Sequence, residues 1–299
     1  MKEILKSDTV IVKQLCNEIL GEEYSEIERM GGLTNHTYRV KMQQGKNYAI
    51  RVPGEGTEKL IVRANERIST ELACELGIDA QCLYFGEDGK KITEYIYEAE
   101  TMSPITLKSS KSIEQMAEVF IRLHTCGKET GVPFEVFDMA VGYEKIIEDN
   151  RVSLYQDYNF IKMEVMEIKE VIDKLGMVKK VPCHNDPLCE NWVRDGHGKM
   201  YLIDWEYGGM NDGMWDLADV SIEAGYGVEE ETKLLETYLK RSVEKDDWRH
   251  FFANKIYVDY LWTLWAKARV PFDGQAMEEW ALERYTRLKR NISKFNNVL

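Results

Sequence analysis

The chain has 299 residues, of which 44% are hydrophobic, and its formal net charge is −13 at pH 7. This length provides for a large core and is greater than that of one simple domain, so we expect two lobes. The sequence has no run of Lys and Arg residues of the kind that contacts the phosphate backbone of a nucleic acid, so we do not expect a nucleic-acid partner. The acidity would tolerate a cationic small substrate, or it serves solubility alone.

The cysteine and hydropathy patterns predict a cytoplasmic protein. No two cysteines form a C-x-x-C pair, so we expect reduced thiols at Cys16, Cys74, Cys82, Cys126, Cys183 and Cys189. Residues 1–6 lack the apolar core of a signal peptide. No segment approaches the roughly 20 apolar residues of a membrane span, so we expect no membrane insertion.

The first third of the chain predicts a β-rich lobe. Alternating polar and apolar side chains are typical of antiparallel strands, and turn residues occur at Gly31-Gly32, Gln44-Gly45-Lys46 and Glu87-Asp88-Gly89. The expected order is helix, three strands, helix and two strands, over residues 9–20, 24–53, 57–76 and 81–97. We place the first lobe at residues 1–96.

From residue 97 onward the periodicity becomes helical. Helices are expected over residues 112–125, 142–150, 159–175, 214–223, 229–240, 246–267 and 274–295. Only the segment 181–207 interrupts them, with two short strands around 192–193 and 200–203 joined at Gly196-His197-Gly198. The fold class is therefore predicted to be α+β, with an antiparallel β lobe followed by a larger helical lobe over residues 97–299.

The interrupting segment carries the pattern H-x-D-x-x-x-x-N followed by I-D-x-E. Asp186 lies on a loop before the hairpin, where its carboxylate could accept a proton from a substrate hydroxyl. Asn191 and Asp204 would supply the hard oxygen ligands that Mg²⁺ prefers. His184 is expected to hold the loop in shape. The joined pattern predicts phosphoryl transfer, with acids on a surface loop as the alternative.

Four segments together resemble the choline/ethanolamine kinases, and most closely the bacterial choline kinases of the LicA type: Gly31–Asn35, His184–Asn191, Ile203–Tyr207 and Met210–Ala218. The resemblance implies a protein-kinase-like fold of two lobes, shared with aminoglycoside phosphotransferases. It implies ATP and Mg²⁺ as cofactors, with nucleotide bound by lobe 1–96 and catalysis and the acceptor in lobe 97–299. Asp216 would cap a helix and brace the catalytic loop.

The resemblance also implies a nucleotide site. Glycines in a turn let backbone N–H groups approach phosphates, Arg51 would stand where protein kinases carry a lysine, and Glu66 would be its ion-pair partner. The backbone of residues 94–96 would receive the adenine. The nucleotide-binding residues implied are Gly31, Gly32, Thr34, Asn35, His36, Arg51, Glu66, Glu94, Tyr95 and Ile96. An ordinary hairpin turn and a weak surface ion pair are the alternatives.

Aromatic residues point to the acceptor. Trp262 and Trp265 have the i,i+3 spacing of one helix side, which is as typical of core residues as of a binding site. The choline kinases carry a comparable Trp-x-x-Trp helix, which favours a binding site. A trimethylammonium group donates no hydrogen bond, so ring faces would hold it by cation–π attraction of about 0.5–2 kcal/mol per contact. The acceptor site implied is Asp186, Glu206, Tyr207, Trp262, Trp265 and Trp280, with Glu223 and Tyr226 as further candidates.

The combined prediction is an ATP-dependent choline kinase that forms phosphocholine, with Asp186 as base and Asn191 and Asp204 as metal ligands. A kinase of ethanolamine, thiamine or an aminoglycoside on the same fold stays open. So does a catalytically silent protein that binds nucleotide or choline. The oligomeric state cannot be predicted from these patterns.

Overall fold

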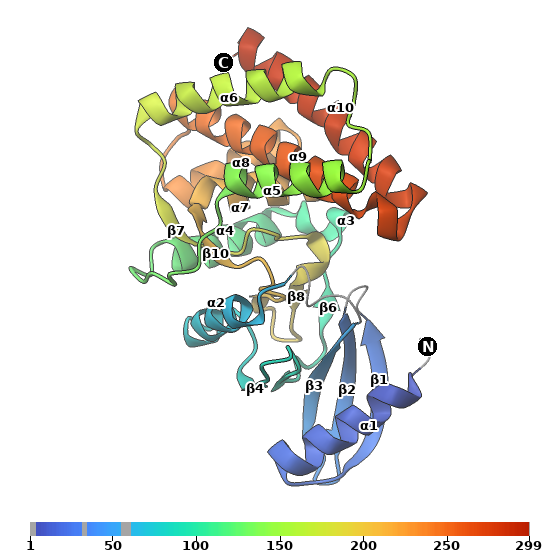
Figure 1. The fold of residues 1–299 in the computed structure, drawn as a ribbon. Coiled ribbons are helices and arrows are strands. Elements are labelled where there is room, and N and C mark those ends of the chain that lie inside the picture. Colours follow the sequence, from blue (N-terminus) through green and yellow to red (C-terminus); the bar gives the residue numbers. More distant parts are fainter. Residues whose placement is uncertain (1–3, 32–34, 55–60, 299) are drawn as a thin grey trace. The chain divides into compact units, whose positions relative to one another are not determined.

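The computed structural model describes residues 4–31, 35–54 and 61–298. Its internal contacts divide the chain into two units (Figure 1): Met1–Met102 with Glu190–Gly208, and Ser103–Cys189 with Gly209–Leu299. The predicted boundary at residue 96 lies a few residues before this division. The hairpin at 190–208 also goes with the first unit, because its strand β8 (Trp192–Arg194) pairs with β6 (Glu100–Thr101) and the Leu202 N–H donates to Ile78 O.

A five-stranded antiparallel sheet forms the first unit's core, in the order β1-β2-β3-β5-β4. The strands are β1 (Tyr24–Gly31), β2 (Asn35–Met42), β3 (Asn47–Pro53), β4 (Cys82–Phe85) and β5 (Lys91–Glu94). One face buries Val40, Ile50 and Ile92 against Val12 of helix α1 (Lys6–Leu15), which lies across β1–β3 in Figure 1. Alternation along β3 sends Arg51 to the opposite face.

Helices of the first unit follow the predicted order with shifted limits. Helix α1 begins at Lys6, before the predicted start, and continues as a π-helical turn, Cys16–Leu20. Helix α2 (Arg63–Glu75) covers part of the span predicted at 57–76, whose residues 57–60 lie outside the described part of the chain. As predicted, Gly77 follows the helix end; its φ of +66° explains why glycine is favoured there.

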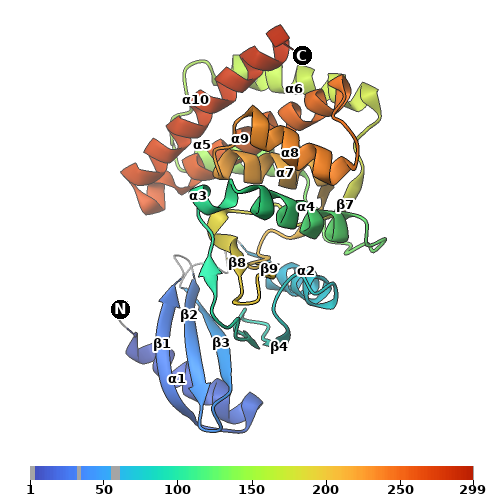
Figure 2. The same cartoon turned by 180° about the vertical axis from the view of Figure 1, so that it is seen from behind.

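The second unit is mainly helical (Figures 1 and 2). Helix α9 contacts α5, α6, α7 and α10 and is buried along most of its length. The helices are α3 (Pro104–Leu107), α4 (Ser110–His124), α5 (Val136–Asp149), α6 (Tyr158–Leu175), α7 (Gly213–Glu223), α8 (Val228–Leu239), α9 (Lys245–Asp273) and α10 (Gln275–Val298). Every helix in the described part of the chain is too short or too polar to cross a lipid bilayer.

Besides the short helix α3, which was not predicted, three features of this unit differ from the prediction. Helix α5 begins at Val136 rather than at Gly142, because buried Val136 and Ala140 anchor its first turns and an exposed glycine does not interrupt it. Helix α9 passes residue 267 and includes Pro271 in its last turn, where one lost backbone hydrogen bond is tolerated. A short antiparallel pair, β7 (Lys180–Cys183) with β10 (Gly209–Asp212), was not predicted.

Candidate functional site

In the first unit a buried ion-pair network joins β3 to α2. Arg51 Nη1 lies 2.5 Å from Glu66 Oε1, and Arg63 Nη1 lies 2.7 Å from Glu66 Oε2. Burial pushes the pKa of Glu66 upward, but the charge and hydrogen bond of Arg51, with Lys91 and Arg63, outweigh it and hold the pKa below its ordinary value. The expected Arg51–Glu66 contact is present. With Glu66 wholly buried and Arg51 at 6% exposure, it is not a surface pair.

Two acids that follow strand β9 (Met200–Leu202) extend this network. Asp204 Oδ1 lies 3.5 Å from Arg51 Nη1, and its φ of +69° is one that Asp tolerates better than most residues. Glu206 Oε1 accepts hydrogen bonds from Arg63 Nη1 at 2.7 Å and Asn35 Nδ2 at 2.8 Å. Burial and the charge of Asp204 raise the pKa of Glu206, against the opposing effects of Asn35, Arg63 and Arg51.

These acids form a candidate cation site. Carboxylate oxygens of Glu66, Asp204 and Glu206 lie within 4.8 Å of one another. The carboxylates of Glu66 and Glu206 already accept hydrogen bonds from Arg63. The Asp204 side chain, by contrast, is 40% exposed and can be reached from solvent. The Ile203 N–H donates to Asn191 O at 2.9 Å, which holds the backbone of Asn191 beside that of Asp204. A carboxylate and a carboxamide carried by neighbouring stretches of backbone are ligand types that fit Mg²⁺, which takes hard oxygen ligands and keeps several waters.

The remaining residues implied for the nucleotide site are dispersed over the first unit. Gly31 ends β1, while Gly32 and Thr34 lie outside the described residues. Asn35 joins the network through Glu206. His36 pairs instead with Asp8 of α1, with Nδ1 2.6 Å from Oδ2, so its side chain lies on the face opposite Arg51.

The segment 94–96 leaves the sheet at the end of β5. The Glu94 N–H donates to Gln81 O, so it is not free for an adenine, and the Glu94 carboxylate lies 3.6 Å from Lys46 Nζ. The Arg39 guanidinium lies over the Tyr95 ring at 5.0 Å. Of the backbone groups of this segment that could contact a base, the Glu94 N–H is thus already engaged within the sheet.

In the second unit the loop that carries Asp186 is fixed by Asp216 of α7. The Asp216 carboxylate accepts the N–H of His184 at 2.8 Å and of Asn185 at 2.7 Å, and His124 Nε2 lies 3.1 Å from the same group. Asn185 adopts a φ of +68°. The Asp186 N–H donates to His184 Nδ1 at 3.3 Å, which agrees with a structural role for this buried histidine.

Asp216 does not cap α7, although it braces the loop as expected. The N-cap is Asp212, whose carboxylate accepts the Met214 N–H at 3.1 Å. Asp216 lies inside the first turn of the same helix. Because an N-cap residue precedes the first helical residue, this position is filled by Asp212, one turn before Asp216.

The tryptophans form a chain of edge contacts in the second unit. Ring centroids are 6.5 Å apart for Trp215–Trp262, 6.2 Å for Trp262–Trp265 and 5.9 Å for Trp265–Trp280. Trp262 is only 4% exposed. The Arg284 guanidinium lies 4.1 Å from the Trp280 ring centroid and pairs with Glu223. One face of the Trp280 ring is therefore already occupied by the guanidinium of Arg284.

The implied acceptor residues fall into both units. Asp186, Trp262, Trp265 and Trp280 belong to the second unit, and Glu206 and Tyr207 belong to the first.

A family model described as choline/ethanolamine kinase matches residues 27–266, which is most of the chain. The chain belongs to the choline/ethanolamine kinase family. Protein LicA of Haemophilus influenzae is 28% identical over 264 residues, covering 85% of this chain and 76% of that protein. The crystal structure of choline kinase LicA from Streptococcus pneumoniae matches with a TM-score of 0.82 at 30% identity, over 97% of this chain and 100% of that one.

The fold of this family member extends to more distant enzymes. A spectinomycin phosphotransferase structure matches with a TM-score of 0.61 at 13% identity over 99% of each chain, which shows a shared fold alone. The predicted family and the protein-kinase-like α+β fold are thus confirmed.

Sequence reasoning missed two charged groups of this kinase-family chain. Arg63 contacts both Glu66 and Glu206, but an arginine at the start of a helix carries no distinctive local pattern. Asp219 of α7 is wholly buried, and among the described residues no donor reaches either of its oxygens. Burial and the charges of Glu223 and Asp186 raise its pKa well above the ordinary value, against the opposing charge of Arg284. The i,i+3 spacing from Asp216 could have indicated Asp219.

Proposed function

We propose that the protein is an ATP-dependent choline kinase, which transfers the γ-phosphate of ATP to the hydroxyl of choline and forms phosphocholine. The observation that carries the proposal is the grouping of Arg51, Asp204 and Asn191. A buried guanidinium lies 3.5 Å from the carboxylate of Asp204, and the backbone carbonyl of Asn191 accepts the N–H of Ile203, the residue before Asp204. Phosphoryl transfer depends mainly on such positioning and charge neutralisation.

In this proposal each polar residue has one task. Asp186 accepts the proton of the acceptor hydroxyl and orients its oxygen toward the phosphorus. Arg51 contacts the nucleotide phosphates, and Glu66 keeps its guanidinium in place. Asn191 and Asp204 hold Mg²⁺, which when bound neutralises charge on the phosphate oxygens. The backbone of residues 94–96 receives the adenine.

The acceptor is the finer part of the proposal. We assign Tyr207, Trp262, Trp265 and Trp280 to the walls around the trimethylammonium group, with Glu206 adding negative charge. The aromatic chain through Trp262 and Trp265 supports this assignment. One observation favours ethanolamine instead: the buried carboxyl of Asp219 has no donor among the described residues and would suit an ammonium that carries N–H groups.

An acceptor panel tests the substrate. The purified protein with ATP and Mg²⁺ is offered choline, ethanolamine, thiamine and an aminoglycoside, and each phosphorylated product is quantified. We expect kcat/KM for choline to exceed that for ethanolamine about tenfold or more, a difference of about 1.4 kcal/mol in transition-state stabilisation. A higher value for another acceptor contradicts the choline assignment and leaves phosphoryl transfer intact. Nucleotide binding without any product contradicts both.

The base is tested by Asp186→Asn, with Asp149→Asn on the exposed surface of α5 as the matched control. We expect kcat to fall by about 10²–10⁴-fold in Asp186→Asn, because the acceptor hydroxyl loses its proton acceptor. Nucleotide affinity, measured by calorimetry, should stay within about twofold of wild type in both variants. Normal turnover by Asp186→Asn would rule out the assigned base.

A further inference from the structure

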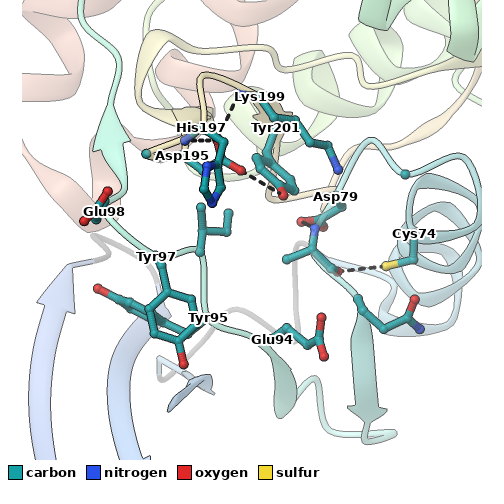
Figure 3. A pocket seen from close by; sticks show the side chains of 15 residues that line it. Cys74, Asp79, Glu94, Tyr95, Tyr97, Glu98, Asp195, His197, Lys199 and Tyr201 are labelled. Carbon is teal, nitrogen blue, oxygen red and sulfur yellow. Dashed lines mark hydrogen bonds between the residues drawn. The ribbon is translucent and has the colours of Figure 1, made fainter. Parts of the chain in front are cut away.

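The first unit contains a cavity of about 560 Å³ whose lining residues all belong to that unit (Figure 3). Its walls come from the end of α2 and the loop after it, from residues 94–98, and from the turn between β8 and β9 with Tyr201. Glu94, Tyr95 and Ile96, whose backbone is proposed to receive the adenine, line it, but none of the charged residues Arg51, Arg63, Glu66, Asp204 and Glu206 does. The volume falls within the range of sites for small organic ligands.

The charges on the walls favour a cation. Four carboxylates line the cavity, at Asp79, Glu94, Glu98 and Asp195, against one ammonium, that of Lys199. The Asp195 carboxylate serves its own turn, since it accepts the N–H groups of His197 and Lys199 at 2.9 Å. An anionic ligand such as a nucleotide phosphate would be repelled by this set.

Aromatic rings on the walls already attract cations. Arg39 lies over Tyr95 at 5.0 Å and Lys199 lies over Tyr201 at 4.1 Å, so two ring faces hold cations of the protein itself. Tyr97 contacts Tyr95 edge-on, with centroids 5.3 Å apart, and is 53% exposed. Its ring adds to a wall that suits an organic ammonium.

Asp79 supplies the specific contact. It is 5% exposed, and its Oδ1 accepts the Ala80 N–H at 2.6 Å. Its Oδ2 is buried and accepts no hydrogen bond from any described residue. A buried carboxylate oxygen without a donor is costly, and a ligand with N–H groups would remove that cost. Figure 3 shows Asp79 on the side of the cavity opposite Tyr95 and Tyr97.

We propose that this cavity binds a small organic ammonium ion with at least one N–H donor, which donates to Asp79 Oδ2 and lies among the tyrosines of segment 94–98 and Tyr201. The site differs from the proposed acceptor site, whose tryptophans lie in the second unit. It does not depend on the proposed kinase activity.

Binding of propylamine, measured by isothermal titration calorimetry at pH 7.5 on the full chain, tests the proposal. Propylammonium carries N–H donors but no hydroxyl, so it cannot be phosphorylated as an acceptor. We expect saturable binding of one equivalent, and binding of tetramethylammonium, which has no N–H group, about tenfold weaker or less. The absence of propylamine binding up to about 10 mM, or equal binding of the two cations, would overturn the site.

Two variants place the ligand. Asp79→Asn should weaken propylamine about tenfold or more, with exposed Glu87→Gln as its control. Gln81→Arg puts a competing guanidinium on the wall of the cavity, at an exposed position, and should also weaken propylamine binding. Gln44→Arg, at an exposed position on the β2–β3 turn, is its control and should leave propylamine binding unchanged. Unchanged affinity in both wall variants contradicts the proposal.

Two further measurements separate this cavity from the sites of the proposed reaction. Trp262→Ala should leave propylamine affinity unchanged, and a loss there would place the ligand in the acceptor site. Saturating ATP with Mg²⁺ should not displace propylamine, because the proposed ammonium contacts are to side chains of Asp79 and of segment 94–98, whereas the proposed adenine contacts are to the backbone of that segment. Competitive displacement would make the cavity part of the nucleotide site and overturn the proposal.

Discussion

At the scale of single residues, Glu66 shows how burial decides what an ion pair is worth. Glu66→Gln would leave Arg51 at 6% exposure with its closest negative charge removed. Breaking a buried pair costs about 3–5 kcal/mol, and the nearby acids Asp204 and Glu206 place the expected loss at the lower end, about 3 kcal/mol. Urea denaturation measures this loss in the free energy of unfolding.

The same helix offers a matched control. Glu71 pairs with Arg67 at 2.7 Å, but both side chains are more than half exposed. Glu71→Gln should therefore change stability by no more than about 0.5 kcal/mol. Similar losses in the two variants would contradict the argument that burial makes the Arg51–Glu66 pair strong.

Asp79 should make the free energy of unfolding depend on pH, and the direction of its pKa shift gives the sign of this dependence. Burial raises the pKa of Asp79 from 3.8 to about 6, although Lys91 and the Ala80 N–H oppose the shift. A carboxyl whose pKa is higher in the folded state contributes most stability below its unfolded pKa. That contribution is lost as pH rises from about 4 through about 6, and the shift corresponds to roughly 3 kcal/mol.

Asp79→Asn removes this titration. The free energy of unfolding of the variant, minus that of wild type, should therefore rise between pH 4 and pH 7 and be constant above pH 7. Urea denaturation at each pH supplies the difference, in which titrations shared by both proteins cancel. A difference that does not change with pH would show that Asp79 keeps an ordinary pKa in the folded protein.

At the scale of elements, α7 and the β7–β10 pair determine the shape of the loop that carries Asp186. The Asp216 carboxylate accepts two N–H groups of this loop, and Asn211 Nδ2 donates to Asn185 Oδ1 at 2.9 Å. In Asp216→Asn one oxygen becomes an NH₂ group that faces a donor. We expect a stability loss of about 1–3 kcal/mol from the unsatisfied N–H.

A bracing role makes a second expectation for Asp216→Asn. Displacement of Asp186 should lower kcat about tenfold or more, while KM for ATP changes little because the proposed nucleotide-binding residues belong to the first unit and Asp216 belongs to the second. Steady-state kinetics separate the two constants. Stability loss with an unchanged kcat would show that the loop tolerates the missing hydrogen bond.

Local patterns predicted most helices and the hairpin because their periodicities are long or bounded by clear turns. The β7–β10 pair was missed because each strand has four residues and its partner is distant in sequence. The site shows the same limit. Asp186, Asn191 and Asp204 form a motif, but the contact of Arg63 with Glu206 joins residues 143 positions apart and has no local signature.

At the scale of the whole molecule, the division into units passes through the motif itself. Asp186 belongs to the second unit, whereas Asn191 and Asp204 belong to the first. A sequence boundary near residue 96 cannot represent this arrangement, because the chain enters the first unit again at Glu190. The proposed base and the proposed metal ligands are thus supported by different cores.

Binding of nucleotide and metal should stabilise the whole protein by linkage. A non-hydrolysable ATP analogue with Mg²⁺ at about 100 times its Kd should raise the free energy of unfolding by about 2.7 kcal/mol, which a rise in Tm would report. Removing Mg²⁺ with EDTA should lose part of this gain, because the cation that Asn191 and Asp204 would hold is then absent.

Asp204→Asn separates the metal from the nucleotide. The variant should still be stabilised by the analogue alone, since Arg51 and the backbone of segment 94–96 are unchanged, but added Mg²⁺ should give little further gain. Asp88→Asn on the exposed β4–β5 turn is the control and should behave as wild type. If Asp204 holds Mg²⁺, its replacement must weaken Mg²⁺ binding and so reduce the stabilisation of the folded protein by Mg²⁺. An equal Mg²⁺ effect in Asp204→Asn and wild type would therefore exclude Asp204 as a metal ligand.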